Sequence, residues 1–126
     1  MKINGIEVEL TVETSWEWCL RMWDDVDERL SFNRYYSVEI AKFEFCEEKG
    51  ITDLSHDCFF CEYAGQGQFI DPVLCDSKCP GALAANYKYK ENNKVLWCCQ
   101  KGKNFADNPH EFNLYLKELN ERRKNG

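Results

Sequence analysis

Four cysteines in the middle of the chain constrain its fold more than any other feature. They form two closely spaced pairs: two residues separate Cys58 from Cys61, and three separate Cys75 from Cys79. Zinc binds four thiolates in a tetrahedron, and such short spacings allow one tight turn to direct two sulfurs at the same ion. The pattern therefore predicts a zinc site of the knuckle or ribbon type, with Cys58, Cys61, Cys75 and Cys79 as the ligands.

The total of eight cysteines in 126 residues is high. In a secreted chain it would indicate disulfides. However, the N-terminal residues contain no apolar signal segment, and no apolar run approaches the roughly 20 residues that cross a bilayer. We therefore expect a cytoplasmic protein without a membrane association, in which thiols bind metal rather than form disulfides. Reduced cysteines that pack as small hydrophobic residues, and regulatory disulfides, are the alternatives.

Other residues could change the set of ligands. Cys98 or Cys99 could substitute for one of the four, although adjacent cysteines rarely both reach one ion. His56, two residues before Cys58, is a weaker candidate. Cys19 and Cys46 lie on the apolar faces of predicted helices, so we expect them to pack in the core.

The nature of the site favours a structural role over catalysis. Four thiolates make a closed site, whereas a catalytic zinc keeps an open position and usually uses histidine or carboxylate ligands. The chain has two histidines and no P-loop, Gly-x-Ser-x-Gly or His-Glu-x-x-His motif. We therefore favour a non-enzymatic module; an enzyme or a redox protein, with Cys58 and Cys61 as the redox thiols, is a further alternative. An iron–sulfur cluster is the alternative cofactor, because it also binds thiolates.

The rest of the sequence predicts an α+β, mainly α fold, with an N-terminal β-hairpin and about three helices packed around the zinc-bound loop region. Asn4-Gly5 is a hairpin-turn dipeptide. Apolar residues recur at helical spacing over residues 12–30, with Thr11 or Ser15 as the N-cap, and over residues 38–49. Ser37 and Gly50 are suited to cap the second helix.

The length suits one domain, residues 1–126. It divides into a hairpin with two helices (1–50), a cysteine-rich metal-binding region (51–107) and a C-terminal helix (108–124). Asn108, Pro109 and Glu111 form the start signal of that last helix. Residues 51–85 lose periodicity, which a metal site would explain. A second hairpin is expected in residues 86–99.

Charge is distributed unevenly along the chain. Residues 1–64 have a net charge of −9 and residues 65–126 a net charge of +3. Because an acidic surface is repelled by phosphates, we expect a protein partner, of unspecified identity, rather than nucleic acid. The alternative is a nucleic-acid-binding zinc knuckle, because basic residues interleaved with aromatic ones suit the binding of single-stranded nucleic acid. Its residues would be Lys88, Lys90, Lys94, Lys101, Lys103, Tyr87, Tyr89 and Trp97.

Several segments resemble a loose family of small uncharacterised proteins encoded by bacteriophages and prophages. The similar segments are Trp16-Glu17-Trp18, Asp57-Cys58-Phe59-Phe60-Cys61-Glu62-Tyr63, Cys79-Pro80 and Leu114-Tyr115-Leu116-Lys117-Glu118-Leu119. The resemblance implies a zinc site at the cysteines and, in a phage, a partner among host or defence proteins in the host cytoplasm. It implies no activity. The second pair in that family often reads Cys-x2-Cys-Pro, so this chain has one extra residue between Cys75 and Cys79.

Overall fold

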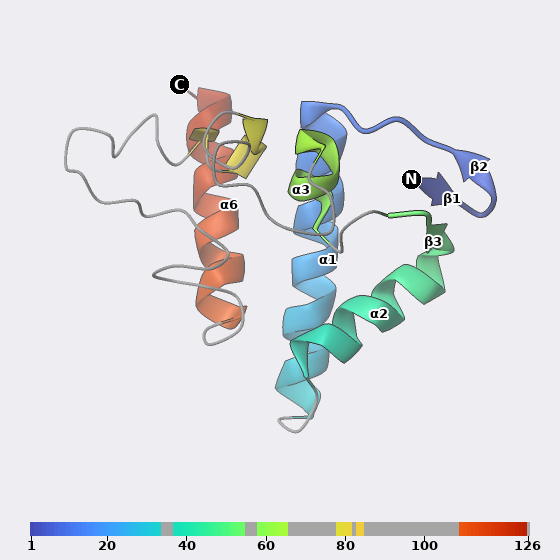
Figure 1. Cartoon of the computed structure of the whole chain (residues 1–126). Helices are drawn as coiled ribbons and strands as arrows, with labels where there is room; N and C mark the ends of the chain where they lie inside the picture. Colours follow the sequence, from blue (N-terminus) through green and yellow to red (C-terminus); the bar gives the residue numbers. More distant parts are fainter. Residues whose placement is uncertain (34–36, 55–57, 66–77, 82, 85–108, 126) are drawn as a thin grey trace.

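The computed structural model of the chain describes residues 1–33, 37–54, 58–65, 78–81, 83–84 and 109–125. It is mainly helical with a small N-terminal antiparallel hairpin, so the predicted α+β, mainly α class is confirmed. Figure 1 shows the elements along the chain. They are β1 (Lys2–Ile3), β2 (Ile6–Glu7), α1 (Val12–Phe32), α2 (Val38–Lys49), β3 (Ile51–Thr52), α3 (Phe59–Ala64) and α6 (Pro109–Asn125).

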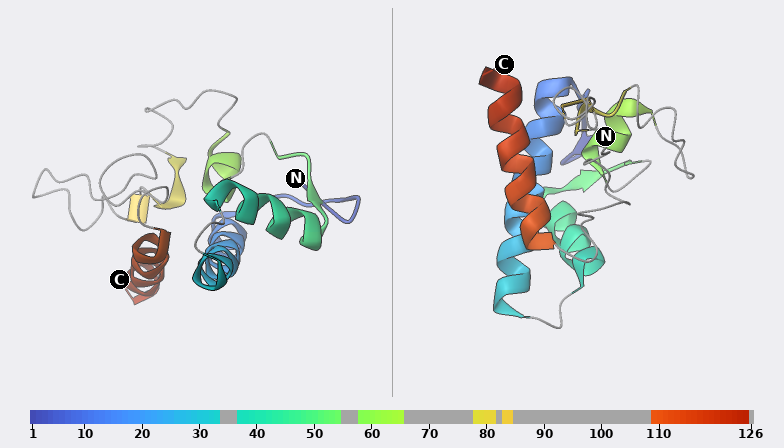
Figure 2. Two further views of the ribbon diagram at one scale, coloured as in Figure 1. Left: turned by 90° about the horizontal axis from the view of Figure 1, so that it is seen from below. Right: turned by 90° about the vertical axis from the view of Figure 1, so that its left-hand side faces the viewer.

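Helix α1 is the central element and packs against α2, α3 and α6. Helix α6 lies alongside α1 and runs antiparallel to it, while α2 and α3 lie on other sides of α1 (Figures 1 and 2). The hydrophobic core fills the junctions between these helices. Its members from the four helices are Trp16, Cys19, Met22, Trp23, Val26, Ala41, Phe45, Phe59, Phe60, Phe112, Leu116 and Leu119.

The N-terminal hairpin turns where the sequence predicts. Asn4 and Gly5 both have positive φ, 52° and 80°, as a two-residue hairpin turn of type I′ requires. The sheet has a third strand, β3, and the strand order is β2-β1-β3. The sequence analysis did not predict β3, because two-residue strands are too short to show alternation. The side chain of Ile6 is 70% exposed on the edge strand β2.

The first two helices begin and end at residues that cap them. The Thr11 hydroxyl accepts a hydrogen bond from the Thr14 backbone N–H at 3.1 Å, and Thr14 Oγ1 accepts one from the Thr11 N–H at 2.7 Å. Ser37 accepts the Ile40 N–H at 3.1 Å, and Gly50 ends α2 in the left-handed region at φ 67°. These caps satisfy backbone groups that have no partner within the helix, and they confirm the predicted bounds of α2.

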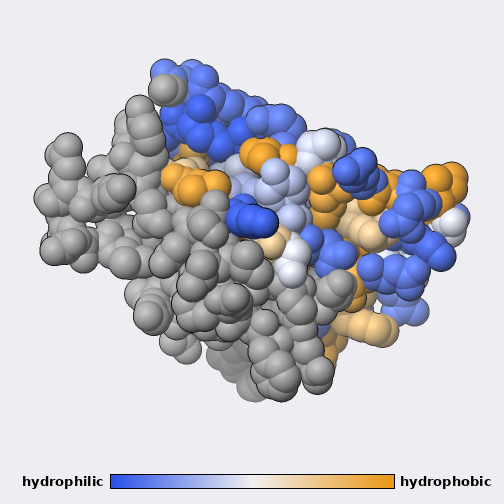
Figure 3. All heavy atoms as spheres, turned by 45° about the horizontal axis from the view of Figure 1, so that its top comes forward, coloured by the Kyte–Doolittle hydropathy of each residue, from blue (hydrophilic) through white to orange (hydrophobic). Residues whose placement is uncertain are grey.

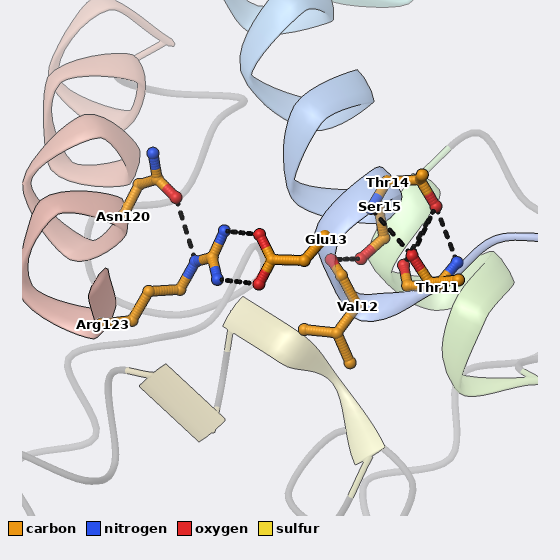
Figure 4. Close-up of polar contacts among 7 residues, drawn as sticks. All are labelled: Thr11, Val12, Glu13, Thr14, Ser15, Asn120 and Arg123. Carbon is orange, nitrogen blue, oxygen red and sulfur yellow. Dashed lines mark hydrogen bonds and ion pairs between the residues drawn. The ribbon is translucent and has the colours of Figure 1, made fainter.

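Polar contacts join α6 to α1 at several points along their interface. Arg123 donates to both Glu13 carboxylate oxygens, at 2.7 and 3.1 Å, and to Asn120 Oδ1 at 2.9 Å (Figure 4). Its guanidinium carbon also lies 4.7 Å from the centre of a Trp16 ring. Further along, Nδ1 of His110 lies 2.8 Å from an Asp27 oxygen. The charged contacts and the packing of Arg123 on Trp16 therefore fix how α6 aligns with α1, although residues 33–108 separate the two helices in the sequence.

A glycine substitution tests the junction between α2 and the hairpin. A Cβ on Gly50 would run into the Asn4 side chain, and the Asn4 N–H donates to the Gly50 carbonyl at 2.8 Å. Because the left-handed conformation already disfavours a side chain, we expect Gly50→Ala to lower the free energy of unfolding by about 2 kcal/mol.

Gly65→Ala is the matched control, because Gly65 also ends a helix, α3, at positive φ, but a Cβ there would meet nothing within 4 Å. It should cost about 1 kcal/mol, the conformational part alone. Urea denaturation measures both variants. Equal losses would contradict a contribution from the Asn4 contact.

The Arg123–Glu13 contact predicts a pH dependence of stability. The hydrogen bonds and positive charge of Arg123 lower the pKa of Glu13 below its usual value of 4.5. Because the folded pKa is the lower one, the stabilisation is fully present above the unfolded pKa and is lost as the pH falls through the folded pKa. Glu13→Gln should therefore lower Tm at pH 7 and leave it unchanged once the pH lies below the folded pKa.

Glu28→Gln, which changes an exposed carboxylate elsewhere on α1, is the control for the loss of one negative charge. Thermal unfolding at a series of pH values follows both variants. A difference between wild type and Glu13→Gln that stays constant down to the lowest pH would contradict the assignment.

Candidate metal centre

The first predicted cysteine pair is brought together at the start of α3. Cys58 is the N-cap residue of this helix and Cys61 lies in its first turn. The Cys61 side chain lies close enough to Cys58 to lower the pKa of the Cys58 thiol. Cys58 is half-buried and Cys61 is 3% exposed. The short spacing thus directs both sulfurs to the same place, although the segment is helical where the sequence analysis expected an aperiodic loop.

Cys19 joins this pair from α1. It lies in the hydrophobic core, as the sequence analysis predicted, and is 1% exposed. Its side chain also lies close enough to Cys58 for the two thiols to shift each other's pKa, a contact that was not predicted from the sequence. The sequence does place Cys19 on the same apolar stripe as Trp16 and Trp23. That stripe had to face the rest of the core, so its position was the available signal for this approach.

Cys79 lies in the same core, 5% exposed. It is near enough to Cys19 for its charge to act on that thiol. Cys46 is half-buried on α2. The described residues do not include Cys75, Cys98, Cys99 or His56. They also do not include the expected second hairpin, Asn108, or the lysines and aromatic residues of the nucleic-acid alternative.

Aromatic side chains hold α1 against α3. The Trp16 and Phe60 rings meet edge to face with centroids 4.7 Å apart, and the Trp18 and Phe59 rings lie 6.1 Å apart. Trp16, Phe59 and Phe60 are at most 1% exposed. This packing excludes water from the thiols and places Cys19 opposite the start of α3.

The surroundings of Cys58 and Cys19 shift the pKa values of these two neighbouring thiols in opposite directions. Hydrogen bonds from Cys19 and Cys61, together with the charge of Lys42 and the Cys61 backbone N–H, hold the pKa of Cys58 well below its usual value of 9.0. Burial, followed by the hydrogen bond with Cys58, raises the pKa of Cys19 well above it. Cys58 is therefore the more acidic of the two thiols.

Lys42 supplies a positive charge inside this acidic half of the chain. The residue is only 3% exposed, although it is a lysine. Its ammonium nitrogen lies 5.0 Å from the centre of a Trp23 ring, an arrangement in which the ring face stabilises the cation. The sequence analysis did not single out Lys42. Its position between Ala41 and Phe45, on the buried face of α2, was the available signal.

The arrangement supplies soft donors in a dry environment. Within the described ranges, no group of three or more histidine, cysteine, aspartate or glutamate side chains is set to hold a metal ion. Cys58 instead lies near both Cys19 and Cys61, whose side chains act on its pKa. Zinc would require these sulfurs to lose their protons and converge on one point. Buried thiols fit zinc in donor type, and the lowered pKa of Cys58 favours the form that binds it.

Comparisons with family models, with curated proteins and with solved structures give no match for this chain. In the part of the chain that the structure describes, every helix is too short or too polar to cross a membrane.

Proposed function

We propose that this chain is a small, non-enzymatic zinc-binding module that acts in the cytoplasm by binding another protein. The observation that carries the proposal is the position of Cys58 and Cys61 at the start of α3, where Cys61 is buried and Cys58 packs against the core that contains Cys19. Ligands as buried as Cys61 leave no open position for a substrate. A metal held there therefore supports the fold rather than a reaction.

A bound metal ion would add the stability that helix α3 lacks on its own. Helix α3 has six residues, and a helix of that length has little stability alone. Its packing on α1 and a shared metal would hold it in place. Since metal binding to such a site is coupled to folding, the zinc would contribute directly to the stability of the module.

The exposed face of α2 is the best-suited surface for a protein partner. Ile40 and Phe43 lie three residues apart, on the same side of the helix, and are 50% and 67% exposed. Glu39 and Glu47 are exposed beside them. Figure 3 draws one face of the molecule, on which hydrophobic residues lie among hydrophilic ones. A partner with an apolar contact surrounded by basic residues matches this face. If the chain is a phage protein, that partner is a host or defence protein.

Metal analysis tests the zinc site. Protein purified without added metal should contain one zinc ion per chain by mass spectrometry and show no visible absorbance. Cys58→Ser/Cys61→Ser should lose the ion and unfold at a lower temperature, because two soft ligands are gone. Cys46→Ser, which removes a half-buried thiol from α2, should keep both the ion and the stability.

Iron with a brown absorbance would replace the zinc site with an iron–sulfur cluster and favour electron transfer or redox sensing. Protein that is folded and free of metal would contradict the proposal altogether.

Surface variants test the binding face. Ile40→Glu/Phe43→Glu should leave Tm nearly unchanged, because both side chains are exposed, and should abolish the capture of specific proteins in an affinity experiment. Leu114→Glu, which changes a side chain 51% exposed on α6, is the control and should capture the same proteins as wild type. If the α2 double variant still captures them, the binding face lies elsewhere.

A further inference from the structure

The N-terminal sheet has an edge to which a further strand can be added. We infer that the outer edge of β2 binds an extended segment of a partner protein, in which lysine or arginine alternates with apolar residues. The segment pairs with residues 6–8 and becomes a fourth strand of the three-stranded sheet. This surface is formed by other residues than the α2 face, and the inference depends on neither that face nor the zinc site.

The hydrogen bonds of the hairpin show which backbone groups point outward. The Val8 N–H donates to the Met1 carbonyl at 2.9 Å, which continues the β1–β2 pairing by one residue pair. Hydrogen-bonded and non-hydrogen-bonded pairs alternate along two antiparallel strands. The neighbouring pair, Lys2 with Glu7, is therefore the non-hydrogen-bonded one. Its geometry directs the N–H and the carbonyl of Glu7 away from β1.

These outward groups of Glu7 lie at the edge of the sheet. The strand order β2-β1-β3 places β2 at one edge, and Figure 1 shows it as the outermost strand, on the side of the molecule opposite α6. Among the residues that the structure describes, none outside the hairpin forms a hydrogen bond with the Glu7 backbone. An edge with open N–H and C=O groups is a template for pairing with another chain, and many proteins bind extended peptides in this way.

A hollow of about 280 Å³ lies beside this edge. Residues 7–10 line it together with Met1 and with Glu62 and Tyr63 from the end of α3. Because four consecutive residues take part, the hollow follows the backbone of this segment. Its volume is just below the range of small-molecule pockets, about 300–1,000 Å³, so it suits side chains of an added strand. The ring of Tyr63, which is 38% exposed, offers a surface to a cationic side chain.

The charges along the edge determine which segment fits. The lining of the hollow contains three carboxylates, those of Glu7, Glu9 and Glu62, and no lysine or arginine. Glu7 pairs with the Met1 amino group at 3.4 Å, whereas Glu9 has no ion-pair partner in the described part of the chain. Opposite charges across neighbouring strands stabilise their pairing, and like charges destabilise it. A second copy of this chain would set one acidic edge against another, so the occupant is a basic segment of a different protein.

The alternation of side chains along a strand gives the rest of the pattern. Ile6 is 70% exposed and points to the face of β2 opposite that of Glu7. A partner residue opposite Glu7 is basic, and its neighbours point to the other face, where an apolar side chain covers Ile6. The segment that fits is thus an alternation of lysine or arginine with residues such as valine.

A capped peptide of about six residues, the common strand length, in which lysine alternates with valine, is the probe. Titration followed by NMR should show saturable binding to the full chain. It should also slow the hydrogen exchange of the Glu7 amide, because this N–H gains a partner. The Val8 N–H, which already bonds to Met1, is the internal control and should change little.

Methylation of the peptide backbone separates strand addition from attraction between charges. Alternate residues of a strand direct their N–H groups to opposite edges. Methylating the lysine nitrogens therefore blocks one edge of the peptide, and methylating the valine nitrogens blocks the other. One of these two peptides should bind like the parent and the other should not. Equal effects of the two methylations would overturn the inference.

Two variants of Glu7 form a matched pair in the chain itself. Glu7→Gln and Glu7→Pro both remove the charge, but only proline also removes the outward N–H, and an edge strand tolerates proline where the N–H faces solvent. Glu7→Pro should bind the peptide about threefold to tenfold more weakly than Glu7→Gln, the effect of one hydrogen bond. Circular dichroism confirms that both variants are folded. If Glu7→Pro does not fold, the methylated peptides decide the question.

The other outcomes are equally decisive. A chain that does not bind the lysine–valine peptide, or that binds it without protecting the Glu7 amide, would overturn the inference. A dimer in size-exclusion chromatography that Glu7→Pro converts to a monomer would also overturn it, because the edge would then belong to a second copy. Saturable binding with a protected Glu7 amide and one tolerated methylation would support it.

Discussion

The packing of α1 against α3 is the interaction on which the rest of the structure depends. Edge-to-face contact between Trp16 and Phe60 brings a six-residue helix onto the central one and in doing so sets Cys58 opposite Cys19. Aromatic pairs of this kind contribute about 0.5–1.5 kcal/mol beyond the area they bury. The side of Trp16 that Arg123 covers belongs to the interface with α6, so one side chain serves two helix contacts.

Local signals in the sequence were sufficient to predict where the elements that they cap begin and end. Ser37 and Gly50 give the bounds of α2 because their roles depend on side-chain oxygen and on positive φ, both local properties. The hairpin turn at Asn4-Gly5 was predictable for the same reason. Strand β3 and helix α3 were not, because each is stabilised by residues distant in sequence, β1 in the first case and α1 in the second.

In the candidate site, too, some features could be predicted from the local sequence and others could not. The pairing of Cys58 with Cys61 followed from their spacing, which is a local property. The approach of Cys19 and the burial of Lys42 depend on which faces of α1 and α2 turn towards α3. A hydrophobic stripe indicates that a face is buried but not which element covers it. For Cys19 the sequence therefore predicted burial correctly and missed the neighbour.

The central position of α1 also determines the order in which its contacts can form. Helix α2 follows α1 closely in the sequence, so their contact closes a short loop at a small entropic cost. Helix α6 returns to α1 only after residues 33–108, and such a long closure is slower and is compensated only when the final interface forms. We therefore expect the α1–α2 contact to form before α6 packs on α1.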